Sequence, residues 1–144
     1  MGYPPEATAP LRQELIDLGA RDLRTPEDVD TLLRDEKGSV LLFVNSVCGC
    51  AAAAARPGLA LALQHDVKPE VVATVFAGVD VEATRQARSH FGDYPSSSPQ
   101  IALFREGRLV QLIQRHQIEG RDAGEVAASL TSAFDRYCGP RVAD

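Results

Sequence analysis

The sequence predicts an α/β fold with a central mixed β-sheet flanked by helices, and three observations support this prediction. Short apolar runs of strand length alternate with stretches whose apolar residues recur at helical spacing. The last two runs, 99–104 and 109–113, are separated by the Glu106-Gly107 turn, which predicts an antiparallel hairpin. The chain has 144 residues, 44% of them hydrophobic, which suits one ordinary core. We expect a single domain over residues 1–144, without repeats or linkers.

The first expected element is a helix over residues 5–18. Its apolar side chains recur at helical spacing, and Gly19 follows as a C-terminal stop. A short strand is expected around residues 22–24, so residues 1–19 form an extra N-terminal helical extension. The side chains predicted on or beside its inward face are Leu11, Leu15, Ile16 and Leu18.

The second helix begins at a clear capping signal. Thr25 can accept a hydrogen bond from the free N–H groups, Pro26 suits the first helical position, and Asp28 completes a capping box. This helix should run to about Glu36.

The elements that follow complete the order. Residues 40–44 form an unbroken apolar run, typical of a central strand covered on both faces. The next helix should be kinked at Pro57-Gly58, because proline lacks an N–H and its ring clashes with the preceding turn. The remaining predicted elements are a strand over 71–77, a helix over 82–91 and a last helix over 122–137, ended by Gly139-Pro140.

The most informative motif is Cys48-Gly49-Cys50, which lies between the buried strand and the alanine run 51–55. A helix N-terminus offers free N–H groups and the positive end of the helix dipole, which stabilise a thiolate. Cys48 should lie at the exposed end of this turn. It is therefore the expected nucleophile, whereas small buried filler is the alternative interpretation of the pair.

Cys50 follows two positions later, and in a regular helix such neighbours point to different sides. A Cys48–Cys50 disulfide would then require a distorted first turn, which predicts a strained and readily reduced bond. This favours a one-thiol route, in which Cys48 attacks and an external thiol releases it.

The third cysteine, Cys138, is expected to take no part in the chemistry. The last helix should start at the active end of the sheet and run away from it, so at about 1.5 Å per residue its end lies about 24 Å off. Cys138 also follows Phe134 by four positions, which places it on the apolar face of the helix.

Composition excludes several classes of protein. The net charge of −5, without a basic run, argues against a nucleic-acid partner. No apolar stretch approaches the roughly 20 residues of a membrane span, and the N-terminus lacks the pattern of a secretory signal. We therefore expect a cytoplasmic protein without membrane contact. There, three cysteines are redox groups, metal ligands or core filler rather than a disulfide framework.

The element order, the cysteine pair, the kinking proline and the Ser-Pro before the hairpin together resemble the thioredoxin fold. The stretches Val44–Cys50, Pro95–Pro99 and Arg115–Gly120 resemble the bacilliredoxins, which act on mixed disulfides between proteins and the low-molecular-weight thiol bacillithiol. The resemblance implies a thiol-disulfide oxidoreductase that removes bacillithiol from proteins, with possible isomerase or oxidase activity. It implies no metal and no tightly bound cofactor, with bacillithiol or a similar thiol as co-substrate and S-thiolated client proteins as partners.

The resemblance implies one pair of substrate-binding residues, and the expected topology indicates a second pair. Ser98-Pro99 should be joined by a cis peptide bond beside the nucleophile, where backbone groups pair with an extended substrate; a trans proline at an edge strand is the alternative. The fifth strand must end at the active edge, which should bring Arg115 and His116 near Cys48. They would recognise a carboxylate or favour the thiolate, the alternative being a solvated charge and a packed histidine.

Two further residues are weaker candidates. Arg56 could contribute to the same electropositive rim, although a solvated helix residue is the simpler interpretation. Glu119 could assist proton transfer near that rim.

Other functions stay open at this point. Cys-Gly-Cys with a distant third cysteine also resembles A-type iron–sulfur carriers, although there the pair lies near the C-terminus of a β-rich chain. A non-catalytic interaction module that keeps the fold is a second alternative, and a hydrolase lacks an evident orienting pair for Cys48. The sequence does not specify the oligomeric state.

Overall fold

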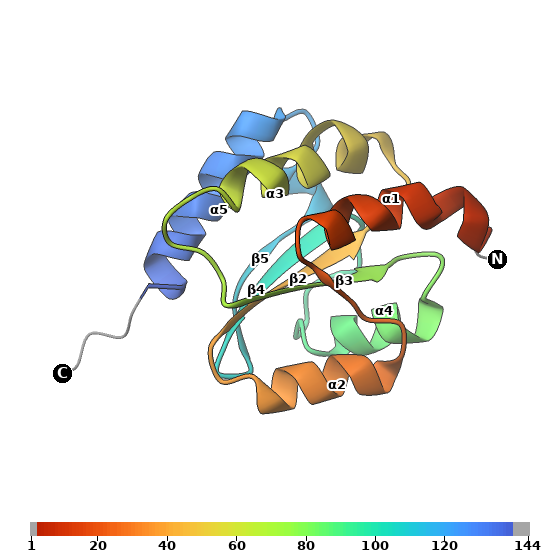
Figure 1. Cartoon of the computed structure of the whole chain (residues 1–144), viewed down its shortest axis with the longest axis horizontal. Helices are drawn as coiled ribbons and strands as arrows, with labels where there is room; N and C mark the ends of the chain where they lie inside the picture. Colours follow the sequence, from red (N-terminus) through yellow and green to blue (C-terminus); the bar gives the residue numbers. More distant parts are fainter. Residues whose placement is uncertain (1–2, 140–144) are drawn as a thin grey trace.

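The computed structural model describes residues 3–139 and confirms the predicted mixed sheet (Figure 1). Five strands lie in the order β1-β3-β2-β4-β5. The first three in sequence are parallel, whereas β4 is antiparallel to β2 and β5 is antiparallel to β4. The strands are β1 (Arg21–Asp22), β2 (Ser39–Asn45), β3 (Val71–Phe76), β4 (Gln100–Arg105) and β5 (Arg108–Ile113).

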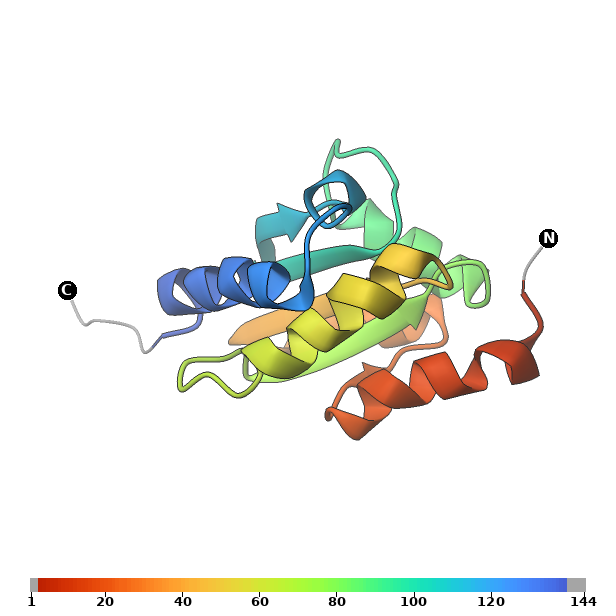
Figure 2. The ribbon, with the colours of Figure 1, turned by 90° about the horizontal axis from the view of Figure 1, so that it is seen from above.

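Helices cover both faces of the sheet. In Figures 1 and 2, α1, α3 and α5 lie on one side, and α2 and α4 on the other. The predicted elements agree with the structure to within about two residues, while the short 3-10 helix η2 was not predicted; Pro140, a predicted helix stop, lies outside the described residues. The helices are α1 (Pro5–Asp17), α2 (Pro26–Asp35), the π-helical turn η1 (Ala51–Ala55), α3 (Arg56–Ala62), α4 (Val81–Ser89), η2 (Arg115–Gln117) and α5 (Ala123–Tyr137).

Strand β2 is the centre of the core, as its uninterrupted apolar run predicted. All seven of its residues are buried. Leu41 and Phe43 pack into the cluster under α1, α3 and α5, whereas Leu42 and Val44 pack into the cluster under α2 and α4. Successive side chains of a strand point to opposite faces, so one short run supplies both halves of the core.

The topology brings three chain segments to one edge of the sheet. Gln100, the first residue of β4, pairs with Val44 near the end of β2, and Ile113, the last residue of β5, pairs with Ile101. The residues after β2, before β4 and after β5 therefore meet at this edge. These are the segments that carry Cys48, Pro99 and Arg115.

Helix α1 buries Leu15, as predicted, but its other buried side chains are Thr8 and Arg12 rather than further leucines. Leu11 and Leu18 are only partly buried, whereas Arg12 is 6% exposed. The Arg12 guanidinium pairs with the carboxylates of Asp22, at 2.5 Å, and Asp80, at 2.9 Å. A buried charge is tolerated when it is paired in this way. The helix is thus attached to the sheet by ion pairs that apolar spacing does not reveal.

The predicted irregularity near Pro57 lies one turn earlier than expected. Residues 51–55 are π-helical, and the N–H of Arg56 donates to the carbonyl of Ala51, five positions before. Pro57 provides no N–H and its ring crowds the carbonyl four residues earlier, so the preceding turn widens. Regular α-helix resumes from Arg56.

Within residues 3–139, no helix is both long and apolar enough to cross a membrane.

Candidate active site

Cys48 lies at the beginning of the helix that follows β2, as predicted. Its carbonyl accepts hydrogen bonds from the N–H groups of Ala51, at 3.2 Å, and Ala52, at 3.4 Å. Both Cys48 and Cys50 are partly buried, and their sulfur atoms are 2.9 Å apart. The expectation that the two side chains point to different sides is wrong, because Cys48 precedes the regular helix and its side chain does not follow helical spacing.

The two thiols differ in acidity. Burial acts to raise the pKa of Cys48, but hydrogen bonds from Cys50, from Ser46 and from backbone N–H groups outweigh it, and the pKa of Cys48 is lowered. Burial raises the pKa of Cys50, as do its hydrogen bond to Cys48 and the charge of that neighbour, to about 11. Cys48 is therefore the more acidic thiol of the pair, the one that loses its proton first and can then accept a hydrogen bond from the Cys50 thiol.

The predicted cis peptide bond between Ser98 and Pro99 is confirmed. The carbonyl oxygen of Ser98 lies 3.9 Å from the sulfur of Cys48. The same oxygen accepts a hydrogen bond from Nη1 of Arg115 at 3.4 Å. The cysteine pair, the proline loop and the residue after β5 thus form one site.

Arg115 is the charged group of this site. Its pKa is raised by the charges of Cys48 and Cys50, and then by Glu119. Its Nε lies 3.2 Å from a carboxylate oxygen of Glu119, and its side chain remains 43% exposed. A cation beside the thiols that is still open to solvent can both favour a thiolate and meet an anionic substrate.

His116, the second residue predicted at this end of the sheet, lines a hollow beside the proline loop. It is exposed, and the hollow, of about 430 Å³, lies between this loop and the end of β5. The 3-10 turn η2 begins at Arg115, so consecutive side chains no longer alternate as they do in a strand. The hollow is lined by Tyr94, Pro95, Ser97, Leu112, Gln114, His116 and Gln117.

Two buried glutamines that the sequence analysis did not single out hold the proline loop. Nε2 of Gln100 donates to Oε1 of Gln114 at 2.8 Å, and the Ser97 hydroxyl donates to the same oxygen at 2.8 Å. Nε2 of Gln114 donates to the carbonyl of Pro95 at 3.2 Å. In the sequence, each of these two glutamines directly flanks an apolar run of strand length, and this position could have revealed them.

Arg56 does not belong to an exposed rim. It is 3% exposed and donates from Nη1 to Oδ1 of Asn45, at 3.0 Å, and to the carbonyl of Ser46, at 2.9 Å. The Ser46 hydroxyl in turn accepts a hydrogen bond from the N–H of Cys48 at 3.1 Å. Both sequence interpretations of Arg56, as a charge of the site surface and as a solvated helix residue, are therefore wrong, because the side chain turns inward beneath the loop.

Cys138 lies at the other end of the sheet. Burial raises its pKa, whereas a hydrogen bond with Ser39 and the charge of Arg105 act against that change. Ser39 is the first residue of β2, while Cys48 follows the last one. In residues 3–139, no group of three or more His, Cys, Asp or Glu side chains is arranged to hold a metal ion. Cys138 cannot serve as a third ligand beside Cys48 and Cys50.

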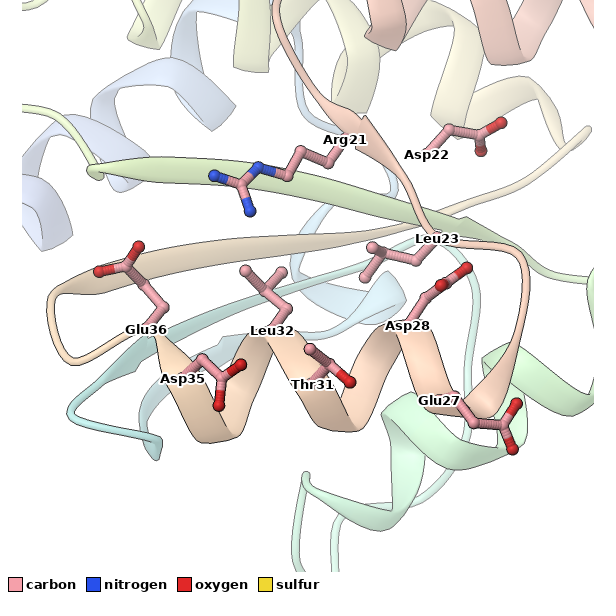
Figure 3. A pocket seen from close by; sticks show the side chains of 9 residues that line it. All are labelled: Arg21, Asp22, Leu23, Glu27, Asp28, Thr31, Leu32, Asp35 and Glu36. Carbon is pink, nitrogen blue, oxygen red and sulfur yellow. The ribbon is translucent and has the colours of Figure 1, made fainter.

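A separate pocket of about 420 Å³ lies between β1 and α2 (Figure 3). Its walls carry several carboxylates, and those of Asp22 and Asp28 already have partners: Asp22 pairs with Arg12, and Asp28 accepts the capping hydrogen bonds of Arg24 and Thr25. Neither cysteine of the motif lines it. We assign no role in thiol chemistry to this pocket.

Comparison with known proteins agrees with the geometry. The family described as disulphide isomerase matches residues 3–138. A bacilliredoxin of Koribacter versatilis is 50% identical over 137 residues, covering 95% of this chain and 94% of that protein. A bacilliredoxin of Halalkalibacterium halodurans is 48% identical over 127 residues, covering 88% and 87%. The chain belongs to the bacilliredoxin family.

Solved structures similar to this bacilliredoxin family member show its fold. The thioredoxin of Fasciola hepatica aligns with a TM-score of 0.57 at 19% identity, covering 81% of this chain and 98% of that one. A mutant thioredoxin from Halobacterium salinarum aligns with a TM-score of 0.57 at 19% identity, covering 85% and 94%. The fold is that of thioredoxin, and the protein, as a bacilliredoxin family member, is a thiol-disulfide oxidoreductase.

Proposed function

We propose that this protein removes bacillithiol, or a closely similar low-molecular-weight thiol, from mixed disulfides on client proteins. The observation that carries this proposal is the pair of sulfur atoms 2.9 Å apart whose pKa values are shifted in opposite directions, beside a partly exposed arginine. One sulfur is ready to attack, the other keeps its proton, and the cation favours an anionic adduct.

In the first step, the Cys48 thiolate attacks the low-molecular-weight sulfur of the client's mixed disulfide. The bond between Cys48 and that sulfur forms as the bond to the client breaks, and the client cysteine leaves as a thiolate. One disulfide replaces another, so no external oxidant or reductant is needed.

In the second step, a free low-molecular-weight thiol releases Cys48. Its thiolate attacks the bound thiol, forms the disulfide of the small thiol and restores the Cys48 thiolate. The alternative is attack by Cys50 on the sulfur of Cys48, which gives the Cys48–Cys50 disulfide and passes the Cys50 proton to the departing thiol. In the adduct Cys48 no longer carries the charge that raises the pKa of Cys50, but burial still raises it, which disfavours the Cys50 thiolate and favours the external route.

The remaining site residues bind the substrate in this scheme. The Ser98 carbonyl, next to Pro99, can accept a hydrogen bond from an extended client backbone, while Arg115 pairs with a carboxylate of the adduct. His116 contacts the part of the substrate that occupies the adjoining hollow. The protein uses no tightly bound cofactor. The same exchange on client disulfides would supply isomerase activity, and a Cys48–Cys50 disulfide, reduced as it oxidises two client thiols, would supply oxidase activity.

The test is a single-turnover reaction with a model protein capped by bacillithiol. Intact-mass spectrometry should show the client losing the mass of bacillithiol while Cys48 gains it, and peptide mapping should locate the adduct. A glutathione-capped client serves as the comparison for thiol specificity. Equal rates for the two caps would contradict the bacillithiol assignment, and absence of any adduct on Cys48 would contradict the mechanism.

A further inference from the structure

Arg56 connects the strand that ends at the site with the loop that carries Cys48. Its Nη1 donates to two acceptors, the Asn45 side chain and the Ser46 carbonyl. Oδ1 of Asn45 also accepts the N–H of Ser46 at 2.9 Å. These hydrogen bonds fix residues 45–46 from the buried side, where Arg56 lies. The Ser46 hydroxyl accepts a hydrogen bond from the N–H of Cys48. Arg56 is thus connected to the backbone of Cys48 through Ser46.

The same cluster reaches helix α1. Nδ2 of Asn45 donates to the carbonyl of Leu11 at 3.2 Å. Nε of Arg56 lies 3.3 Å from Oε1 of Glu14, within ion-pair distance but without the geometry of a hydrogen bond. Helix α1 lies on the same face of the sheet as α3 (Figure 1). The N-terminal extension is therefore joined to the support of the cysteine loop.

The partners of Arg56 indicate that it supports the cysteine loop and does not serve stability alone. Burying a guanidinium carries a large desolvation cost, and the one carboxylate within ion-pair distance among residues 3–139, that of Glu14, is itself 51% exposed. The two hydrogen-bond acceptors of Arg56 belong to the last residue of β2 and to the first residue of the loop, three and two positions before Cys48. The cation that acts on the Cys50 thiol is Arg115, whose charge works to lower the pKa of that group. The contribution of Arg56 is geometric.

We propose that Arg56 is a positioning residue for thiol exchange: it fixes Asn45 and Ser46, and through the Ser46 hydroxyl it holds Cys48 where the helix N-terminus and Ser98 surround the sulfur. The inference rests on the proposed role of Cys48 as nucleophile. Loss of the guanidinium would free the Ser46 backbone and so displace the Ser46 hydroxyl, which favours the Cys48 thiolate. The sulfur could then move from its attack position. A displacement of about 1 Å can cost about 100-fold in rate.

The experiment compares Arg56→Met and Arg56→Lys with Arg12→Met. Arg12 is the matched control, because it is also buried and charged but pairs with Asp22 and Asp80 rather than with the cysteine loop. The readouts are iodoacetamide labelling of Cys48 against pH, mapped by mass spectrometry, the single-turnover rate with the bacillithiol-capped client, and the midpoint of thermal unfolding.

We expect Arg56→Met to move the labelling midpoint of Cys48 to higher pH and to slow single turnover by about 10-fold or more. Arg56→Lys should recover part of both, because an ammonium keeps the charge but cannot reproduce the fork of a guanidinium. Arg12→Met should lower the unfolding midpoint while the labelling midpoint stays that of the wild type. If Arg56→Met does not fold, an intermediate result for Arg56→Lys carries the test.

Two results would overturn the inference. One is an unchanged labelling midpoint and turnover rate in the Arg56 variants that fold. The other is an equal change in Arg12→Met, which would make the effect one of general stability. Failure of the proposed function looks different, since the wild-type protein would then label first at Cys50 or would take no adduct on Cys48.

Discussion

The sulfur of Cys48 lies 3.9 Å from the carbonyl oxygen of Ser98, although the two residues are 50 positions apart in the sequence. The mixed sheet produces this relationship, because β2 ends where β4 begins. The nucleophile thus faces backbone polar groups of a second loop, and Arg115 donates to the same carbonyl from a third segment. The nucleophile, a carbonyl that can bind the substrate backbone and a cation that can bind substrate charge therefore lie together at one edge of the sheet.

The first prediction separates the roles of the two cysteines. Cys50→Ala should still take the thiol from a capped client and should keep the adduct on Cys48 until an external thiol is added, because only the slower internal release by Cys50 is removed. Cys48→Ala should lose the reaction, since the pKa of the remaining Cys50 is about 11 in the wild-type protein and burial still raises it. Intact-mass spectrometry over time measures both. An adduct on Cys50 in the wild type would reverse the assignment.

The second prediction concerns pH. An attacking thiol reacts as its thiolate, so the rate rises with pH through the pKa of Cys48, and because that pKa is lowered the rise should occur at lower pH than for an ordinary cysteine. Cys50→Ala removes a hydrogen bond that favours the thiolate, which should shift the rise toward higher pH. Alkylation rates of Cys48 between about pH 5 and 10 test this. An identical profile in the two proteins would show that Cys50 does not stabilise the thiolate.

Some features of the fold follow from local sequence alone. The Thr25 and Asp28 capping box is present as predicted, because its partners are three residues apart and need no tertiary structure. The central position of β2 follows equally directly from an apolar run that has no polar face to expose. The cis bond before Pro99 required more, since only the family resemblance indicated it.

The hydrogen-bond network beneath the site could not be predicted from the sequence, because its members become neighbours only in the folded protein. Arg56 lies in a helix between alanine and proline, where nothing nearby marks it as buried; its partners come from the end of β2 and from α1. Likewise, topology correctly placed the end of β5 at the active edge, but the 3-10 turn that starts at Arg115 directs His116 into a neighbouring hollow. Sequence pattern identifies which segments meet, whereas side-chain direction depends on turns and partners.

The third prediction uses this difference between Arg115 and His116. Arg115→Ala should slow attack on an anionic mixed disulfide by about 10-fold and attack on an uncharged disulfide by less, because its exposed guanidinium provides charge recognition. His116→Ala is the neighbouring control and should leave the ratio of the two rates near that of the wild type. Raising the salt concentration should reduce the advantage of the wild type over Arg115→Ala. Equal slowing for both substrates would remove the charge-recognition role.

The fourth prediction concerns the contact between α3 and α5. A Cβ atom at Gly58 would lie 2.7 Å from Cγ1 and 2.8 Å from Cβ of Val126. This overlap should cost about 1–3 kcal/mol, whereas alanine otherwise gains roughly 0.5–1 kcal/mol over glycine in a helix. Gly58→Ala should therefore lower the free energy of unfolding. Gly49→Ala, which meets nothing within 4 Å, is the control and should stay within about 0.5 kcal/mol. Chemical denaturation measures both, and a Gly58→Ala protein as stable as the wild type would contradict the packing.

The fifth prediction is that Cys138 takes no part in the reaction. It lies beside Ser39 and Arg105 at the opposite end of β2 from Cys48, and in Figure 2 α5 ends at the opposite end of the molecule from the beginning of α3. Burial raises its pKa, so it should label slowly with iodoacetamide near neutral pH, when Cys48 labels readily. Cys138→Ala should keep the single-turnover rate of the wild type, and its modest loss of packing should appear only in thermal unfolding. A Cys48–Cys138 disulfide peptide recovered from oxidised monomer would show instead that the two ends of the sheet come together, which this topology does not allow.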